Sequence, residues 1–286
     1  MVRLNTPLKR GVNERDLSLK MTKSAKTVVT RIQAGQKPVR QTDEVATEEP
    51  LEIRVDTRPV SVTMRTPGHD EELAAGFLLT EGLITNRTDI SRIAPHSRND
   101  LGNVLDVFLA AGTAVDFAQL TRHVFASSSC GLCGKATIEA VHQHFNPVKS
   151  RWAVSAKTLL SLPEKLHQAQ EAFSRTGGLH AAAVFTREGE LVVLREDVGR
   201  HNAVDKVLGH GLLGGLLPFD RHILMVSGRA SFEILQKALA ARIVVVAAIS
   251  APSSLAVQFA KKSRQTLAGF VRGERMNVYS GAERVE

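Results

Sequence analysis

Cysteine and aromatic side chains are scarce in this chain of 286 residues. It contains two cysteines, one tryptophan and one tyrosine. With so few rings on which bases could stack, nucleic acid is not expected as a main partner. No apolar run approaches the roughly 18 residues that a membrane helix needs, and the N-terminus lacks the apolar region of a signal peptide. We therefore expect a cytoplasmic protein without membrane contact, in which a structural disulfide has no place.

Positive charge is concentrated near the N-terminus. The formal net charge is +8, and residues 1–45 hold ten Lys/Arg against four Asp/Glu, a surplus of six. The periodicity of this segment is weak. We interpret it as a flexible, solvated basic tail rather than a nucleic-acid arm or a targeting segment.

The pattern becomes regular from Leu51. Apolar residues alternate with polar ones over residues 51–55 and again over 60–64, which predicts a hairpin with a turn at 56–59. Three acids open a predicted helix from Asp70 to Leu79, and Val104 to Leu109 is a further predicted strand. These elements indicate a small α+β domain over residues 46–125.

The second half of the chain alternates buried strands with helices. The stretch AAAVFTREGELVVLRED predicts a hairpin with its turn at Glu188 and Gly189. The stretches ILMVSGRASFEILQKAL and VVVAAISAPSSLAVQFA each pass from an apolar strand through small polar residues into a helix. Two short extended stretches about Gly273 close the chain. This order predicts a layered α/β domain over residues 126–286.

Both cysteines stand in SSSCGLCGK, residues 127–135, where Cys130 and Cys133 form a C-x-x-C pair at the start of a predicted helix. Such a pair serves zinc binding, dithiol exchange or sulfur carriage. A structural zinc site normally has four ligands, and the chain has no second pair. A helix N-terminus lowers a thiol pKa, so redox exchange and sulfur carriage both stay open.

A zinc-dependent nucleobase deaminase is the sharpest metal alternative. Its signature joins H-x-E to P-C-x-x-C, and residues 69–71 supply the first part. However, Ser129 rather than proline precedes Cys130. We favour the simpler interpretation that residues 69–71 begin a helix.

Polar residues gather where the predicted strands of the second half end. They lie in residues 195–206, 227–231 and 250–256, each next to a predicted helix N-terminus. Each of the two serine stretches is by itself as well explained as a helix cap. Together with Arg200, Arg229 and Arg272, they are expected to meet at one edge of the sheet and to bind a polyanion.

Six motifs in order resemble the FdhD family, the formate dehydrogenase accessory sulfurtransferases. They are TPGHDEELAAGFLLTEGLI, SSSCGLCGKA, TGGLHAAA, REDVGRHNAVDKVLG, VSGRASFEILQKA and AISAPSSLAV, within residues 50–279. The resemblance implies a three-layer C-terminal domain similar to the cytidine deaminase fold without its zinc site, and a homodimer. It also implies a sulfurtransferase: Cys130 carries a persulfide and Cys133 is its partner. The sulfur comes from a cysteine desulfurase and goes to the molybdenum cofactor of formate dehydrogenase.

The resemblance further implies that the cofactor is bound in its bis-guanine-dinucleotide form, as a substrate. The matching segment is FVRGER, which comprises Phe270, Val271, Arg272, Gly273, Glu274 and Arg275. From residue chemistry we add three candidates: Asp197 for a guanine edge, and Ser227 and Arg229 for phosphate. The alternative to a sulfur carrier, besides the deaminase, is a non-catalytic chaperone for formate dehydrogenase.

Overall fold

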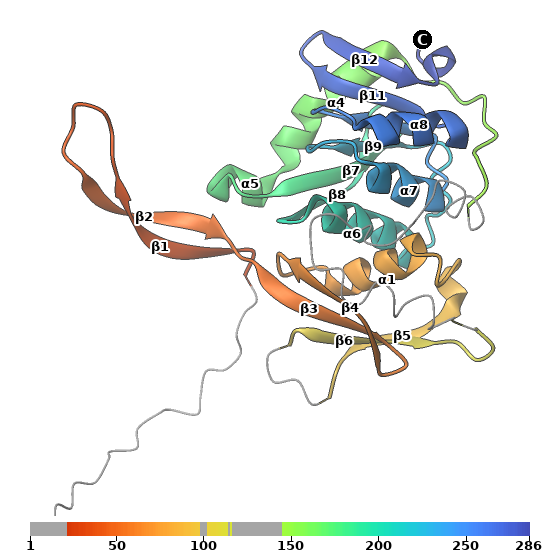
Figure 1. Cartoon of the computed structure of the whole chain (residues 1–286), viewed down its shortest axis with the longest axis horizontal. Coiled ribbons are helices and arrows are strands. Elements are labelled where there is room, and N and C mark those ends of the chain that lie inside the picture. The colour runs from red at the N-terminus through yellow and green to blue at the C-terminus, as the bar shows by residue number, and fades with distance from the viewer. Residues whose placement is uncertain (1–21, 98–101, 114, 116–144) are drawn as a thin grey trace, which may run out of the picture.

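The computed structural model describes residues 22–97, 102–113, 115 and 145–286 (Figure 1). Strands in these residues form three sheets, of two, four and six strands. The chain is therefore mixed α/β, as the sequence predicts. Among the helices of these residues, none is both long and apolar enough to cross a bilayer.

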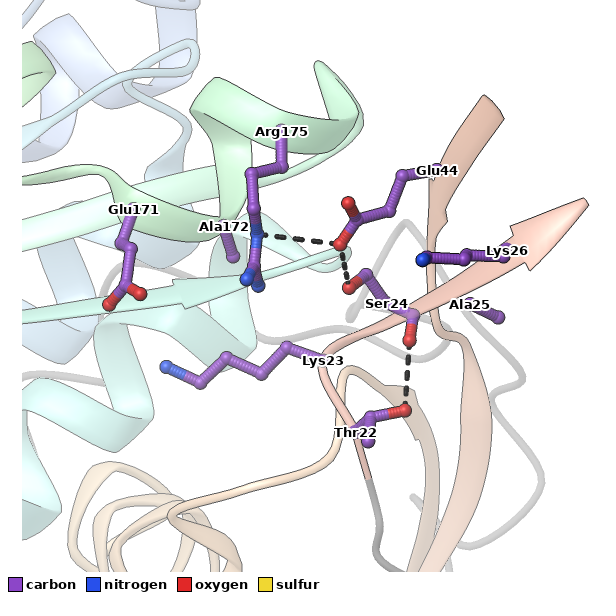
Figure 2. A pocket seen from close by; sticks show the side chains of 9 residues that line it. All are labelled: Thr22, Lys23, Ser24, Ala25, Lys26, Glu44, Glu171, Ala172 and Arg175. Atoms are coloured by element: carbon purple, nitrogen blue, oxygen red, sulfur yellow. Dashed lines mark hydrogen bonds and ion pairs between the residues drawn. The ribbon is translucent and has the colours of Figure 1, made fainter. Parts of the chain in front are cut away.

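A hairpin comes first in the described chain. Its strands, β1 (Ser24–Arg31) and β2 (Val39–Ala46), pair antiparallel and extend away from the rest of the molecule (Figure 1). At its base, Arg175 of α5 (Glu171–Thr176) forms an ion pair of 3.4 Å with Glu44 of β2 (Figure 2). The ion pair ties the base of the hairpin to the body.

This hairpin differs from the flexible tail that the sequence led us to expect over residues 1–45. Strands occupy residues 24–31 and 39–46, whereas residues 1–21 lie outside the described residues. The sequence analysis did not predict these strands, because both faces of the hairpin mix valine and threonine with charged residues. No period-two pattern of apolar residues therefore arises. The content of Val and Thr, rather than their spacing, was the available signal.

The four-stranded sheet has the order β4-β3-β6-β5. Its strands are β3 (Glu49–Val55), β4 (Arg58–Arg65), β5 (Ile90–Pro95) and β6 (Val104–Leu109). The predicted hairpin and the predicted strand at 104–109 are confirmed. Asp56 and Thr57 make the turn between β3 and β4 with φ of 47° and 68°, the left-handed backbone that a two-residue hairpin turn requires.

Helix α1 (Asp70–Thr80) covers the inner face of this sheet and confirms the predicted helix. A short 3-10 helix, η1 (Arg87–Asp89), follows it. Leu73 and Leu78 of α1 are buried in the same cluster as Leu51 and Ile53 of β3.

The six-stranded sheet has the order β12-β11-β10-β9-β7-β8. Its strands are β7 (His180–Phe185), β8 (Leu191–Asp197), β9 (Ile223–Val226), β10 (Val245–Ala248), β11 (Thr266–Arg272) and β12 (Arg275–Ser280). Strands β8, β9, β10 and β11 run in one direction. Strands β7 and β12 run in the opposite direction. The predicted hairpin about Gly189 and the pair about Gly273 are both confirmed.

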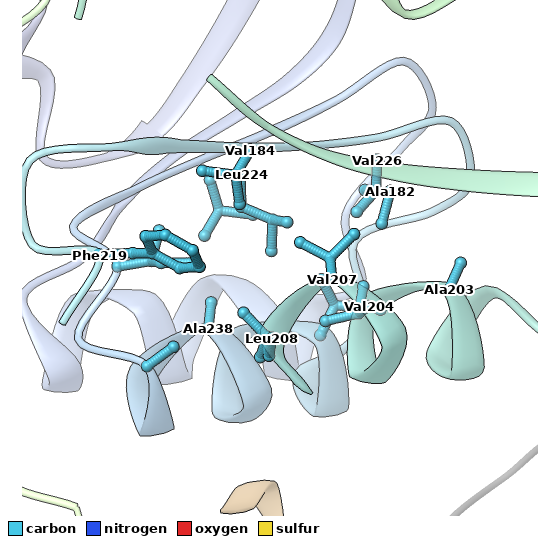
Figure 3. Close-up of a cluster of buried hydrophobic side chains, with 14 of the residues drawn as sticks. Ala182, Val184, Ala203, Val204, Val207, Leu208, Phe219, Leu224, Val226 and Ala238 are labelled. Atoms are coloured by element: carbon cyan, nitrogen blue, oxygen red, sulfur yellow. The ribbon is translucent and has the colours of Figure 1, made fainter. Parts of the chain in front are cut away.

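Helices cover both faces of this sheet (Figure 1). One face carries α6 (Arg200–Leu213), α7 (Phe232–Ala240) and α8 (Ser254–Ser263); the other carries α4 (Ala156–Ala169) and α5. A 3-10 helix, η2 (Ala282–Arg284), ends the chain. In the core, apolar residues of β7 and β9 lie over those of α6, and Phe219 closes one end (Figure 3). Every residue of β9 and β10 is buried, as central strands covered on both faces must be.

Helices α1 and α6 approach until their backbones touch. A Cβ atom built on Gly76 of α1 would lie 1.8 Å from the carbonyl oxygen of Asp205 in α6. Reciprocally, a Cβ atom on Gly209 of α6 would lie 1.8 Å from the carbonyl oxygen of Glu72 in α1. No side chain fits at either position. This crossing joins the layer of α1 and the four-stranded sheet to the six-stranded sheet.

The crossing predicts that Gly209→Ala destabilises the protein strongly. Because the added methyl group meets rigid backbone, the two helices must separate, and we expect the free energy of unfolding to fall by about 3 kcal/mol. Urea unfolding would measure this. The matched control is Gly178→Ala, whose Cβ atom would meet its first neighbour, the Ala46 methyl group, at 3.4 Å. Equal unfolding midpoints for the two variants would contradict the packing argument.

Candidate functional site

The loops that follow β8, β9, β10 and β11 meet at one edge of the six-stranded sheet. These strands are parallel to one another, so their carboxyl ends share an edge. Strand β7 runs the opposite way and begins there with His180, which is paired with Asp197 at the end of β8. The predicted convergence of the polar stretches at one edge is therefore confirmed, and we call this place the carboxyl edge.

Main-chain hydrogen bonds connect these loops. Ala230, in the loop before α7, donates to the carbonyl of Ala251 at 3.2 Å and accepts from the amide of Ser253 at 3.0 Å. The amide of Phe270 in β11 donates to the carbonyl of Ser250 at 3.1 Å. Helices α7 and α8 are capped by the hydroxyls of Ser231 and Ser253. The serine stretches thus act as helix caps, and the caps hold the loops in fixed positions.

The segment 270–275 forms the end of β11 and its turn into β12. Phe270 has a φ of 52°, and the guanidinium of Arg272 lies over its ring, 5.5 Å from the centroid. The side chain of Val271 is buried in the core, whereas residues 272–275 are exposed. The two arginines of this turn are therefore accessible to an anion, and Val271 is not.

A close contact holds this segment against the loop before α8. A Cβ atom on Gly269 would lie 2.9 Å from Cδ of Pro252 and 3.1 Å from Cε2 of Tyr279. Glycine is required here because the β11 backbone passes directly against the proline ring.

Asp197 does not fit the guanine-binding role suggested from sequence. Its side chain is fully buried, and one oxygen accepts from the amide of Thr66 at 3.1 Å and lies 2.6 Å from Nζ of Lys206. The other oxygen accepts from the amide of Gly199 at 2.8 Å and from Nδ2 of Asn202 at 3.0 Å. Both oxygens are occupied inside the protein. The carboxylate stabilises the start of α6 instead of facing a ligand.

Cations surround the other candidates at this edge. Ser227 lies between β7 and β9, where its hydroxyl accepts from the amide of Ala181 at 2.9 Å; Arg229 is exposed. Within the described residues, the buried Nε of Arg200 has no hydrogen-bond partner. Burial, followed by the charges of Arg200 and Arg229, lowers the pKa of His180. This electropositive field suits an anionic ligand.

His201, the second residue of α6, is not the base of a catalytic triad. Its Nε2 lies 3.1 Å from Oγ of Ser231 and 3.2 Å from Oε2 of Glu233. A relay would place the nucleophile and the carboxylate on opposite ring nitrogens, and here both face the same one. Burial, together with the charges of Lys237 and Arg200, lowers the pKa of His201 to about 3. The histidine is a neutral packing element behind the carboxyl edge.

Two ionic clusters that the sequence analysis missed join α1 to the larger sheet. In the first, Nζ of Lys237 in α7 lies 2.9 Å from Asp205 of α6 and 3.0 Å from the hydroxyl of Thr80 in α1. Burial lowers the pKa of Lys237, but Asp205 and its neighbouring carboxylates outweigh this effect and raise it above the ordinary value. The cluster is therefore charged and internally paired.

In the second cluster, Glu72 of α1 accepts two hydrogen bonds, of 2.6 and 2.7 Å, from Arg195 of β8. His210 of α6 lies 3.0 Å from the same carboxylate. Periodicity gives no signal for these clusters, because their members are distant in sequence. A lysine or acid at a position that the helix pattern assigns to the core would have been the only indication.

Two cavities are described for this chain, and neither is lined by the loops that follow β9, β10 and β11. The first, of about 500 Å³, opens between the base of the hairpin and α5 (Figure 2); its lining residues are Thr22, Lys23, Ser24, Ala25, Lys26, Glu44, Glu171, Ala172 and Arg175. The second, of about 380 Å³, follows β8 and shares Lys23 and Glu171 with the first. Neither cavity contains residues 270–275 or 227–231 in its lining.

The remaining predicted site residues cannot be placed with these. Cys130 and Cys133, with the helix expected after them, lie outside the described residues. The H-x-E stretch at 69–71 begins α1, where His69 is the N-cap. In the parts of the chain that the structure describes, no group of three or more His, Cys, Asp or Glu side chains is arranged to hold a metal ion.

Comparison with known proteins gives consistent matches over most of the chain. A model of the FdhD/NarQ family matches residues 46–286. A protein of Streptomyces avermitilis named sulfur carrier protein FdhD is 50% identical over 270 residues, 90% of this chain and 94% of its own. One of Mycobacterium tuberculosis with the same name is 51% identical over 251 residues, 84% and 91% of the two chains.

A solved structure agrees with these matches. The crystal structure of a protein from Desulfotalea psychrophila, described as a formate dehydrogenase accessory protein, superposes with a TM-score of 0.73 at 26% identity. It covers 92% of this chain and 99% of its own.

The low pKa of His201 predicts a loss of stability in acid. The unfolded histidine titrates near 6.5 and the folded one near 3, so the unfolded state binds the extra proton between these values. The contribution is complete above pH 6.5 and is lost as the pH falls towards 3. Between pH 7 and pH 5, the free energy of unfolding should fall by about 2 kcal/mol more in the wild type than in His201→Gln.

Urea unfolding at several pH values would measure this difference. His167→Gln, which removes an exposed histidine of α4, is the control. If both variants change the pH dependence equally, the assignment to His201 is contradicted.

Proposed function

The chain belongs to the FdhD/NarQ family, and we propose that it carries sulfur from a cysteine desulfurase to the molybdenum cofactor required by formate dehydrogenase. The observation that carries this proposal is the identity of about half of all residues to proteins named sulfur carrier protein FdhD, over 90% of the chain. The family model matches residues 46–286, the range within which all six motifs lie. The protein would act as a sulfurtransferase in the cytoplasm.

The proposed sulfur transfer begins at Cys130. Its thiolate attacks the outer sulfur of the donor persulfide, so that a new S–S bond forms and the donor cysteine leaves as a thiolate. Cys130 then carries a persulfide. Cys133 has two possible uses: it attacks the inner sulfur, which releases the outer one as hydrosulfide and leaves a Cys130–Cys133 disulfide, or it only lowers the pKa of Cys130.

The carboxyl edge is the proposed binding place for the guanine-dinucleotide form of the cofactor, as the substrate. Arg272 and Arg275 are exposed in the turn after β11 and are suited to pyrophosphate. Arg229 and the hydroxyl of Ser227 lie at the end of β9, next to Arg200, whose buried Nε has no hydrogen-bond partner among the described residues. Phe270, whose ring lies beneath the Arg272 guanidinium, is half-buried beside them. Asp197 has no part in this proposal, since its oxygens are occupied.

The arrangement of the chain is also part of the proposal. Residues 46–125 would form the small α+β domain, and residues 126–286 a three-layer domain similar to cytidine deaminase without its zinc. A layer of helices on each face of the six-stranded sheet is consistent with this likeness. We propose that the protein is a homodimer, which binds first the cysteine desulfurase and then formate dehydrogenase.

The sulfur step predicts that Cys130→Ala accepts no sulfur. Incubated with a cysteine desulfurase and cysteine, the wild type should gain the mass of one sulfur atom on Cys130, and this adduct should release thiocyanate with cyanide. Intact-mass spectrometry with peptide mapping measures both. Cys133→Ala is the matched control and should still be charged. An unchanged yield of labelled sulfur on Cys130→Ala would contradict the assignment.

The substrate site predicts a preference for GDP over ADP that depends on the turn after β11. Loss of one charge-assisted contact in Arg272→Gln should weaken GDP binding about tenfold. Titration calorimetry would measure the affinities. Arg221→Gln, which removes an exposed arginine just before β9 at the opposite edge of the sheet, should bind as the wild type does. Equal affinity for GDP and ADP, or equal loss in both variants, would count against the site.

A further inference from the structure

The hairpin of β1 and β2 is a two-stranded sheet with an unpaired edge on each side. Within the described residues, no third strand adjoins it, and residues 30–40 are all exposed. The hairpin extends away from the body of the molecule (Figure 1). A two-stranded hairpin alone is marginally stable in water, and further strands supply the stability that it lacks. Its open edges are therefore sites at which another strand can pair.

The register shows which main-chain groups of β2 face outward. The amide of Thr47 donates to the carbonyl of Lys23 at 3.0 Å, so the main-chain groups of this pair point inward, between the strands. The pairing continues without a shift to the end of both strands. Because the direction alternates from residue to residue, Arg40, Thr42 and Glu44 direct their amides and carbonyls away from β1.

These outward groups are largely free within one copy of the chain. The amide of Glu44 donates to the carboxylate of Asp43 at 2.9 Å. Among the described residues, this is the only hydrogen bond of the three outward amides and carbonyls of β2. The Asp43 side chain is exposed, so it can turn into water when another acceptor approaches. The edge of β2 can therefore accept a further strand.

A second copy of β2 fits this edge in antiparallel direction. When Thr42 lies opposite Thr42 of the other copy, Arg40 lies opposite Glu44, and Val39 lies opposite Val45. The two valines are 56% and 42% exposed in one copy. Arg40 and Glu44 both direct their main-chain groups outward, so each such pair exchanges two hydrogen bonds. The strand is therefore complementary to itself in charge, in apolar contact and in hydrogen bonding.

Other alignments of the same edge lose this match. A centre on Arg40, Asp43 or Glu44 places two like charges directly opposite each other, which destabilises a strand pair. A centre on Gln41 places Val39 opposite Asp43. The other open edge offers no equivalent, because β1 reads SAKTVVTR and contains no acid. The charges of the hairpin thus select β2, in one register.

The side chains of the charged pair are available for this contact. Within the described residues, the exposed guanidinium of Arg40 has neither an ion pair nor a hydrogen bond. Glu44 uses its Oε1 atom for both the hydroxyl of Ser24 and the guanidinium of Arg175 (Figure 2). Its Oε2 atom is left for a second guanidinium.

We propose that two copies of the chain pair through their β2 strands, antiparallel and centred on Thr42, to form one four-stranded sheet. Each copy uses the same surface, so the contact closes as a dimer and does not extend into a filament. The proposal rests on the homodimer proposed above and names its interface. Two Arg40–Glu44 pairs and two Val39–Val45 contacts then lie symmetrically about Thr42.

Sedimentation velocity of the full-length protein, at a series of micromolar concentrations, tests this interface with Thr42→Pro. The amide at this position faces away from β1, so proline removes no hydrogen bond within the hairpin and blocks only the added strand. We expect the dimer to dissociate about tenfold more readily or more. Thr30→Pro is the matched control, because it places proline at an exposed, outward position of β1. It should associate as the wild type does.

Three outcomes would overturn the interface: a wild type that is monomeric, a dimer that Thr42→Pro leaves unchanged, or an equal loss in both proline variants. Sulfur loading of Cys130 in the same preparations tests the proposed function separately. A protein that is charged with sulfur but fails the proline test would lose this interface and keep its role as a sulfur carrier.

Exchange of the charges tests the register. Arg40→Glu places two acids opposite each other, and Glu44→Arg places two arginines opposite each other, so each variant alone should dimerise about tenfold more weakly or worse. An equimolar mixture restores both opposite pairs and should form heterodimers as tight as the wild-type dimer. A mixture that associates no better than either variant alone would contradict the pairing of Arg40 with Glu44.

Discussion

The backbone contact between α1 and α6 is the constraint on which the rest of the structure depends. Gly76 and Gly209 remove both side chains at the crossing, so each helix meets a carbonyl of the other. This contact fixes the four-stranded sheet against the six-stranded one. It also brings Thr66, just before α1, to the carboxylate of Asp197 at the end of β8. The carboxyl edge is therefore built by both halves of the chain.

Buried ion pairs fix how the elements around this contact are aligned. Apolar packing tolerates small shifts between helices, whereas an ion pair removed from water must keep its geometry. The Lys237–Asp205 and Lys206–Asp197 pairs are almost completely buried and connect α7, α6 and β8. Removing one partner would leave a charge without compensation, which is costly. The pairs thus favour one alignment of α6 against α7 and β8, and with it one position for the start of α6.

Local sequence patterns predicted the strands, loops and helices of the site better than the roles of its individual residues. An apolar strand followed by small polar residues and a helix is a local signal, and the order of such units places their loops at one sheet edge; both loops before α7 and α8 were found in this way. Residue roles were less predictable. Asp197 has the chemistry for guanine, but its partner Thr66 is 131 residues away. Val271 belongs to the FVRGER segment, yet its side chain points into the core.

The sequence by itself determined the mixed α/β class, the paired strands within 51–64 and 181–197, the first helix, and the family resemblance, because each depends on short-range alternation or on motifs in fixed order. Only the tertiary structure decided that the basic segment after residue 22 forms a hairpin, that Asp197 and His201 are internal, and that β8 is an edge strand among the described residues. These properties depend on which distant groups become neighbours. The same residue type can be exposed to water in one protein and buried with a partner in another, so only the folded arrangement distinguishes the two cases.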